Sequence, residues 1–343
     1  MIGLRITNPD GSSFSFNENT TPATNLWTKA VDVRSGSWTC PNPIPQGYKF
    51  VISRGGALAS VRFVQHGNAM VATGTETLVS YSESNRLVTV RNLHGVGTEP
   101  IQIIAYQDYN KIPLAGSAGL KILGSAIFLN SLPVTGYSYA FHKKIMIIDG
   151  VFNPSKLGAG LTPDNAIYFF YSTDAENYIG REPIRDGGGS VKSLRISNIR
   201  RDSHSLAKSK YYVIAFRTAK SGELETNGCG LKLRNIDGNV TFNSQFNVMT
   251  KPVLVPSSEF AVGKGKTIPG IKRLMYTPQR VGDYFGHTDG GYLDYLNVCQ
   301  YSATSLGLSR YRYFYNSAYI GETTTVLSSF PVLVLDAEDY FKF

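Results

Sequence analysis

The stretch GLRITNPDGSSF, residues 3–14, decides the fold of this chain because related stretches recur twice further along. GLKILGSAIF begins at Gly119, and GLKLRNIDGNVTF begins at Gly230. The second stretch starts 116 residues after the first, and the third starts 111 residues after the second. A nearly constant period of about one domain length indicates tandem copies of one module.

Each of these stretches has the pattern of a β-hairpin. In the first copy Leu4 and Ile6 alternate with polar residues, as in a strand with one buried face. The turn residues Asn-Pro-Asp-Gly at 8–11 follow, and Phe14 and Phe16 begin a return strand. We therefore predict a strand–turn–strand unit at each of the three positions.

Two further features recur in the same order within each copy. An expected strand ends in asparagine, and a closing apolar strand then follows. The asparagines are at positions 92, 198 and 316, and the closing strands begin at Ile101, Tyr211 and Pro331. We predict module boundaries near residues 115 and 227, which gives modules 1–115, 116–227 and 228–343. Modules of this size usually keep separate hydrophobic cores, so separate cores are expected here.

Composition supports an all-β chain of several globular units. The 343 residues are 42% hydrophobic and 17% charged, and glycine and aromatic residues are abundant. Short apolar runs alternate with Gly, Asn, Ser and Pro, and no amphipathic helix of three turns is evident. The predicted fold class is all-β, with three tandem β-sandwich-like modules. No apolar run of signal-peptide or membrane-span length is present, so we expect synthesis in a cytosol and no membrane insertion.

Motifs for catalysis or cofactor binding are missing from the sequence. There is no P-loop, HExxH motif or GxSxG elbow, and the three cysteines have no metal-ligand spacing. We predict no enzyme activity, no cofactor and no bound metal. The densest polar segment contains Asp283, His287, Asp289 and Asp294. A metal site or a carboxylate pair in this segment is the alternative.

Tyrosine is concentrated in the third predicted module, which holds ten of the 21 tyrosines. In RYRYFYN the tyrosines alternate, so a regular strand would place them on one face. Tyrosine provides a large contact area and a polar tip, which suits interfaces and sugar-binding surfaces. A contact surface and a tyrosine-rich core are both open interpretations. The candidate contact residues are Tyr284, Tyr292, Tyr295, Tyr311, Tyr313 and Tyr315.

The net charge of +9 is uneven, because the second predicted module alone carries +5. A patch of cations could bind an anionic partner such as nucleic acid, although a solvated loop is the favoured interpretation. No known nucleic-acid-binding motif accompanies the patch, so nucleic acid is not an expected partner. The candidate anion-facing residues are Arg195, Arg200, Arg201, Lys208 and Lys210.

The opening residues resemble the N-termini of tail and tail-tip proteins of tailed bacteriophages, which begin with a G-L-x-I-x-N-x-x-G-x-x-F hairpin. Gly3, Leu4, Ile6 and Asn8 carry the resemblance together with the GSSF segment at 11–14, which ends in Phe14. It covers about a dozen residues, is repeated at Gly119 and Gly230, and carries no catalytic residue. It implies a structural β protein of a tail tip, baseplate or fibre.

The sequence thus predicts a structural component of a virion tail, assembled in the host cytoplasm and contributing to host attachment. Expected partners are other tail proteins, a host receptor or glycan, and further copies of this chain. A trimer and a pseudo-threefold monomer are both open. The alternatives are a surface-glycan-binding or glycan-cleaving protein and a nucleic-acid-binding protein.

Overall fold

The fold is described from a computed structural model, which confirms that the described part of the chain is all-β. The described residues are 3–7, 13–17, 23–32, 35–45, 48–54, 59–66, 69–91, 98–107, 119–121, 128–130, 137–185, 187, 191–227, 231–234, 237–250, 252–287, 291–316 and 323–343. Within these ranges, no helix has the length and apolar character needed to cross a membrane.

A six-stranded antiparallel sheet forms the centre of the molecule, in the order β13–β17–β14–β22–β27–β20. Its strands are β13 (Ser138–Asp149), β17 (Lys208–Thr218), β14 (Ile167–Tyr171), β22 (Leu274–Tyr276), β27 (Pro331–Asp336) and β20 (Val253–Pro256). A five-stranded sheet has the order β21–β25–β24–β23–β26. Its strands are β21 (Lys266–Thr267), β25 (Ser305–Asn316), β24 (Gly291–Ser302), β23 (Arg280–His287) and β26 (Thr324–Leu327).

Two three-stranded sheets come from the first third of the chain. One contains β3 (Ala23–Asp32), β10 (Thr98–Gln107) and β5 (Tyr48–Arg54), and the other contains β4 (Ser37–Thr39), β9 (Val88–Arg91) and β8 (Leu78–Tyr81). Larger hairpins are formed by β6 (Ala59–His66) with β7 (Ala69–Glu76) and by β15 (Asn177–Arg185) with β16 (Val191–Arg200). Short 3-10 helices lie at η2 (Pro154–Lys156), η3 (Ser257–Glu259) and η4 (Ala337–Asp339).

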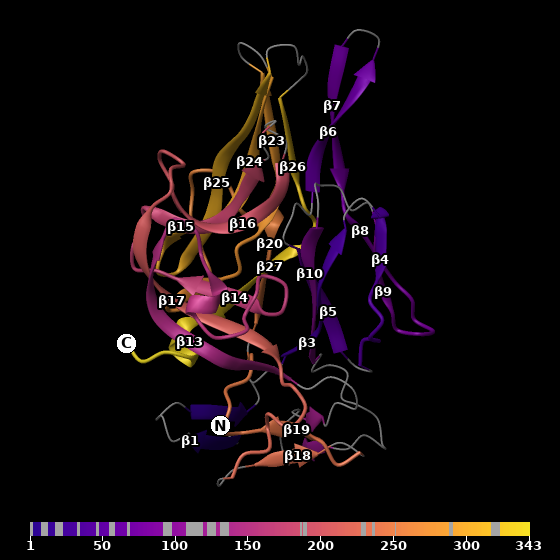
Figure 1. The fold of residues 1–343 in the computed structure, drawn as a ribbon, viewed down its shortest axis with the longest axis vertical. Helices are drawn as coiled ribbons and strands as arrows, with labels where there is room; N and C mark the ends of the chain where they lie inside the picture. Colours follow the sequence, from indigo (N-terminus) through magenta and orange to yellow (C-terminus); the bar gives the residue numbers. More distant parts are fainter. Residues whose placement is uncertain are drawn as a thin grey trace.

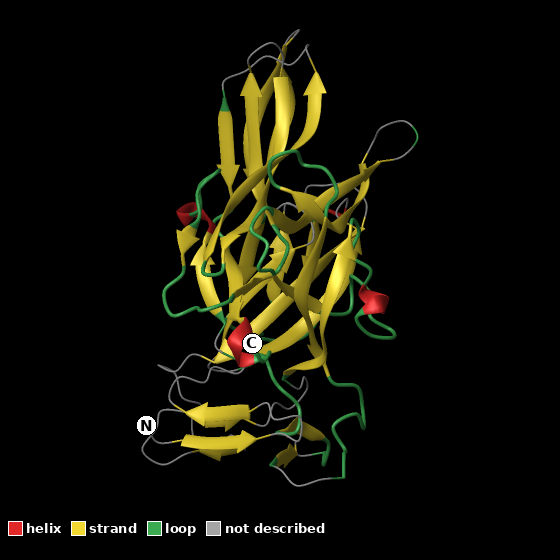
Figure 2. Cartoon of the chain, turned by 90° about the vertical axis from the view of Figure 1, so that its left-hand side faces the viewer, coloured by secondary structure: helices red, strands yellow, loops and turns green. Residues whose placement is uncertain are grey.

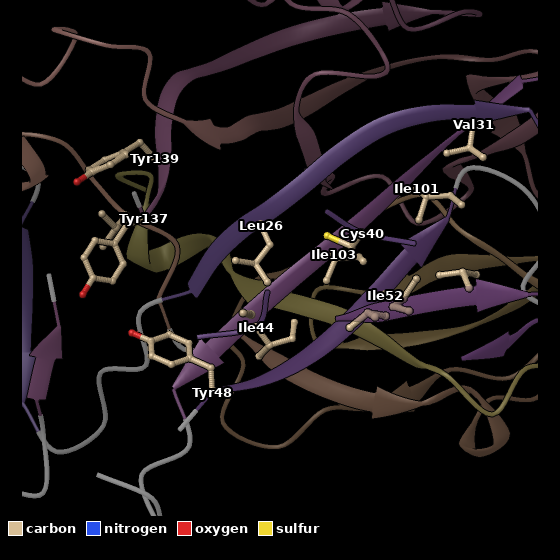
Figure 3. Close-up of a cluster of buried hydrophobic side chains, with 14 of the residues drawn as sticks. Leu26, Val31, Cys40, Ile44, Tyr48, Ile52, Ile101, Ile103, Tyr137 and Tyr139 are labelled. Atoms are coloured by element: carbon tan, nitrogen blue, oxygen red, sulfur yellow. The ribbon is translucent and has the colours of Figure 1, made fainter. Parts of the chain in front are cut away.

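The sheets pack in layers because both faces of the inner strands are apolar. In β17, Ile214 and Phe216 pack toward the β3–β10–β5 sheet, while Val213 and Ala215 pack on the opposite side. The side chains of β10 also point to two different cores. Ile104 packs against the central sheet, and Ile103 lies in the core on the other face of β10. Figure 3 shows that outer core, where side chains from β3, β5 and β10 gather with Tyr137 and Tyr139. Alternation along each strand thus produces successive cores.

All three recurring sequences form the predicted hairpins. β1 (Gly3–Thr7) pairs with β2 (Ser13–Asn17), β11 (Gly119–Lys121) with β12 (Phe128–Asn130), and β18 (Lys232–Arg234) with β19 (Val240–Asn243). Leu4 pairs with Phe16 and Leu120 with Leu129, as expected for residues at equivalent positions. Leu231, which aligns with them in the sequence, instead precedes β18 and its backbone bonds Ser244, so the expected equivalence of the three leucines is wrong for the third copy. Gly238 has a φ of 81°, the left-handed conformation that favours glycine in such a turn.

The three hairpins gather at one end of the long axis, here called the hairpin end (Figures 1 and 2). In Figure 1 a strand pair in the colour of residues 119–130 lies next to β19, and β1 lies on the other side of the same end. At the opposite end, β6–β7 and the neighbouring ends of β23 and β24 form what we call the tip. Recurrence in the sequence therefore corresponds to grouping in space.

The expectation of separate cores is wrong. The central sheet combines β13, β14 and β17 with β20, β22 and β27, which lie beyond residue 227. Ala23, Val51 and Ile104 from the first third complete a core with residues from both later thirds. The boundaries near 115 and 227 stay a prediction, and at least one core draws residues from both sides of each boundary.

The expected strands are present, with one change at their ends. The segments beginning at Ile101, Tyr211 and Pro331 lie in β10, β17 and β27. Asn316 ends β25 as predicted, and Asn92 lies outside the described residues. Asn198 does not end its strand, since β16 continues to Arg200. It is buried and its amide donates to Ile148 O and Ser209 Oγ, so it serves the interior.

Two side-chain amides on β24 join the five-stranded sheet to its neighbours. Gln300 accepts from the Ser172 N–H at 3.2 Å and donates to the Ser172 carbonyl at 2.7 Å. Asn297 makes the same pair of bonds with Arg181, at 3.2 and 3.3 Å. The amides thus satisfy buried backbone groups that no strand partner reaches.

We expect Gln300→Met to lower the free energy of unfolding by about 2–5 kcal/mol, because two buried backbone groups lose their partner. Gln279→Met is the matched control. Gln279 is equally buried, and its Nε2 has no hydrogen-bond partner among the described residues. Urea unfolding followed by circular dichroism measures both variants. Equal losses would show that side-chain volume, and not the amide bonds of Gln300, stabilises the junction.

Candidate contact surfaces

Two of the candidate tyrosines form a half-exposed pair close to the tip. Tyr284 on β23 and Tyr292 on β24 have ring centroids 5.9 Å apart. The guanidinium carbon of Arg310 lies 3.6 Å from the centroid of the Tyr284 ring, within cation–π distance. A hydrogen bond with Tyr284 raises the pKa of Tyr292, and burial adds to the effect. These rings offer aromatic area and hydroxyl groups to a partner.

Tyr295 belongs to the interior, because its exposed fraction is 3%. The guanidinium carbon of Arg280 lies 3.4 Å from the Tyr295 ring centroid, and Arg280 Nε donates to Asp283 Oδ1 at 2.8 Å. Asp283 has an exposed fraction of 0%. For Tyr295 the core interpretation is therefore the correct one, and it offers no surface to a partner.

Tyr311 lies between the five-stranded sheet and the β15–β16 hairpin. Its hydroxyl is 3.5 Å from Glu182 Oε1, and burial raises its pKa. The predicted alternation through Tyr313 and Tyr315 is interrupted by a register shift. Tyr311 pairs with Tyr295, whereas Tyr315 pairs with Tyr292, three residues away on β24. The bulge breaks the single face, and the side chains of Tyr313 and Tyr315 lie outside the described part.

The candidate anion-facing residues all have partners within the chain. Arg195 forms a bidentate pair with Glu182, with distances of 2.9 and 3.1 Å. The Arg201 guanidinium carbon lies 4.3 Å from the Tyr301 ring centroid. The other three are also engaged: Arg200 pairs with Glu176 and Asp202, Lys208 with Asp149, and Lys210 lies over the Tyr212 ring. This arrangement supports the interpretation of a solvated, internally balanced surface.

Two carboxylates of the polar segment from Asp283 to Asp294 are buried inside the structure. Asp283 pairs with Arg280, and Asp294 is buried with an exposed fraction of 2%. Asp289 and the side chain of His287 lie outside the described residues. Within the described ranges, no three His, Cys, Asp or Glu side chains cluster in a way that could hold a metal ion.

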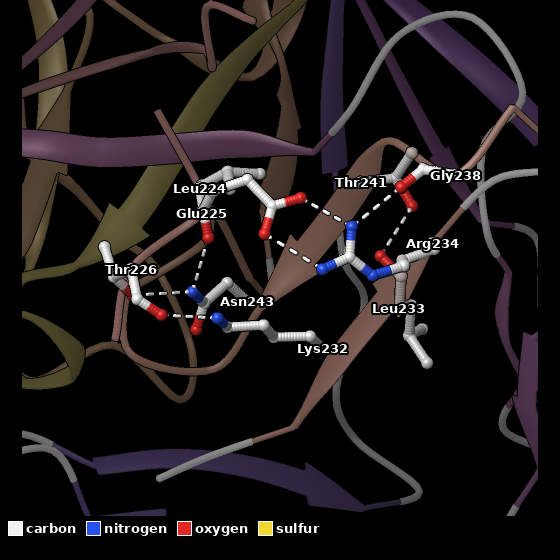
Figure 4. Close-up of polar contacts among 9 residues, drawn as sticks. All are labelled: Leu224, Glu225, Thr226, Lys232, Leu233, Arg234, Gly238, Thr241 and Asn243. Atoms are coloured by element: carbon white, nitrogen blue, oxygen red, sulfur yellow. Dashed lines mark hydrogen bonds and ion pairs between the residues drawn. The ribbon is translucent and has the colours of Figure 1, made fainter. Parts of the chain in front are cut away.

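At the hairpin end, polar contacts anchor β18–β19 to the preceding segment 224–226 (Figure 4). Arg234 forms a bidentate pair with Glu225, at 2.5 and 2.9 Å, and also donates to the Gly238 carbonyl at 2.7 Å. The Arg234 bond lowers the pKa of Glu225. Asn243 donates to Leu224 O at 2.8 Å. The hairpin is therefore fixed to the body on both of its strands.

Sequence reasoning missed Glu225, Asn297 and Gln300. Asn297 and Gln300 bond residues more than 100 positions away, and Glu225 bonds Arg234 across a turn, and the polar residue types alone gave no sign of these contacts. Comparison with known proteins adds no relative, because no family model, curated protein or solved structure matches the chain.

Proposed function

We propose that this chain is a structural component of a bacteriophage tail, located in a tail tip, baseplate or fibre. The observation that carries the proposal is the grouping of three recurring hairpins at one end of the molecule (Figure 1). The three similar hairpins lie at the same end although they are far apart in the sequence. Together they offer a surface of repeated units, which suits attachment to an assembly of repeated subunits such as a tail.

The difference between the two ends of the molecule supports this role. The hairpin end attaches to neighbouring tail proteins, and the tip carries the half-exposed Tyr284 and Tyr292 away from it. The bulk between them is stacked sheets, with cores on both faces of the central sheet. These packed sheets hold the hairpin end and the tip in a fixed position relative to each other. The tip makes the contact with a host receptor or glycan.

The test changes the hairpin end and the tip in different variants and examines particles purified from a host that carries the gene. A charge reversal at Arg234 breaks the Glu225 pair of the hairpin end, so Arg234→Glu is expected to remove the protein from particles, as measured by mass spectrometry. Tyr284→Ala with Tyr292→Ala is expected to leave incorporation unchanged and reduce adsorption to host cells. Leu78→Ser, an exposed change on β8 between the two ends, is the control. Absence of the wild-type protein from particles would refute the proposal.

A second candidate function is glycan binding at the tip, which the Tyr284–Tyr292 ring pair favours. Glycan cleavage through Asp283 has less support, because this carboxylate is buried and paired with Arg280. A nucleic-acid-binding role has less support for a similar reason, since the five candidate cations contact partners within the chain. Retention on heparin that falls steeply with salt would favour it again.

A further inference from the structure

Strand β13 forms one edge of the central sheet. It pairs with β17 on its inner side, and the strand order places no described strand on its outer side. Isolated bridges flank this stretch, from Tyr139 to Val248 and from Val151 to Ser197. Between residues 141 and 149, the outer edge meets no strand of the described chain. Figure 1 shows β13 as a long strand near the C-terminus.

The hydrogen-bonding direction of this edge follows from the register. The Gly150 N–H donates to the Ala207 carbonyl at 2.8 Å, and the carbonyl of Lys210, which lies opposite Ile147, points away from β13 and accepts from Ser172 Oγ at 2.8 Å. Backbone groups alternate along an antiparallel strand, which makes Ile148 and Met146 the next residues bonded toward β17. The N–H and C=O groups of Ile145 and Ile147 therefore point away from the sheet.

The side chains beside this edge are apolar and exposed. Ile145 has an exposed fraction of 44% and Ile147 of 63%. On the other face, Ile148 is buried against Phe152 and Phe170, so the two faces of β13 differ sharply. An edge with open backbone groups and exposed β-branched side chains is a template for a further strand.

We propose that β13 pairs antiparallel with β13 of a second copy, about a twofold axis that passes beside Met146. Ile145 of each copy then lies opposite Ile147 of the other. Lys143 lies opposite Asp149 of the other copy, so the pairing is complementary in charge as well as in apolar surface. The two central sheets become one continuous sheet through both copies, which is an isologous contact.

Charge complementarity selects this register over its neighbours. The hydrogen-bond direction also permits Ile145 opposite Ile145, or Ile147 opposite Ile147. The first places Lys143 opposite an isoleucine, and the second places Asp149 opposite one. The existing partners of these charges remain in place: Lys143 Nζ donates to the Tyr340 carbonyl at 3.1 Å, and Asp149 pairs with Lys208 at 2.9 Å. Pairing adds a second cation to each Asp149.

Sedimentation of the purified full chain over a concentration series tests the pairing. Wild type is expected to be a dimer at high concentration, and Ile147→Lys is expected to raise the dissociation constant about tenfold or more. Leu78→Lys is the matched control, since Leu78 is 54% exposed on β8 in a different sheet. A wild type that stays monomeric, or equal effects of the two lysine variants, would overturn the proposal.

Charge reversal and cross-linking test the register. Lys143→Glu alone is expected to weaken the dimer, and Lys143→Glu with Asp149→Lys to restore it. Met146→Cys is expected to form a disulfide between copies, because residues at the axis have Cα atoms about 4.5 Å apart. Wild type gives the background from the native cysteines. Cross-linking through Ile145→Cys or Ile147→Cys in place of Met146→Cys, or failure of the double reversal to restore the dimer, would overturn this register.

Discussion

Raising the pH from 9 to 11 is expected to lower the free energy of unfolding by about 8 kcal/mol, enough to unfold a typical domain. Burial raises the pKa of six tyrosines well above their usual value of 10; these are Tyr137, Tyr139, Tyr178, Tyr211, Tyr276 and Tyr340. The folded chain keeps these protons, whereas the unfolded chain releases them above pH 10. The unfolded state then binds fewer protons, so stability falls as pH rises, by about 1.4 kcal/mol per tyrosine at pH 11.

Several of these phenols also need their proton as donors. Tyr139 donates to the Thr241 carbonyl at 2.9 Å, and Tyr276 donates to the Ile179 carbonyl at 3.1 Å. Urea midpoints at pH 9, 10 and 11, with phenolate absorbance recorded in parallel, measure the effect. Tyr178→Phe removes one titrating group and should reduce the loss by about 1.4 kcal/mol. Full phenolate absorbance at pH 11 in a chain that remains folded would contradict the expectation.

Arg280→Ala is expected to destabilise the protein by about 3–5 kcal/mol, because it leaves the buried carboxylate of Asp283 without its cation. Arg280 also covers the Tyr295 ring, so the same change removes aromatic contact from the five-stranded sheet. The measurement is the free energy of unfolding in urea at pH 7.

An exposed ion pair supplies the comparison for Arg280→Ala. Lys266 and Glu259 pair with about 40% of each side chain exposed, and Lys266→Ala should cost about 1 kcal/mol or less. The double change Arg280→Met with Asp283→Leu should recover much of the loss, because no unpaired charge then remains buried. If Arg280→Ala costs no more than Lys266→Ala, the buried pair does not stabilise the β23 region.

Local chemistry made the strands and hairpins predictable. The continuous apolar run that begins at Tyr211 and the Asp-Gly turn at residues 237–238 act within a few residues, so the sequence alone reveals them. Sheet order was not predictable, because β14 meets β22 through Phe170 and Tyr276, which are far apart in sequence. Alternation along a strand shows which residues share a face of the sheet. It does not show which of the two faces packs against another sheet.

The same limit explains the outcome for the candidate residues. Tyr284 and Tyr295 lie on neighbouring strands, but Tyr295 pairs with Asp283, the residue before Tyr284, so the two tyrosines lie on opposite faces of the sheet and differ in exposure. The β25 bulge was invisible in the alternating RYRYFYN pattern, since one extra residue in a strand leaves no compositional sign. The cation patch looked open because Glu182 and Asp149, which neutralise two of its members, lie on other strands.

The position of β27 in the central sheet has a consequence for biosynthesis. This strand, residues 331–336, lies between β22 and β20, and it supplies Val332, Leu333, Val334 and Leu335 to the cores on both faces. The central sheet therefore remains incomplete until residues 331–336 have left the ribosome. Contacts of such long sequence separation form slowly, so completion of this sheet is expected to follow the synthesis of β27 and not to proceed strand by strand.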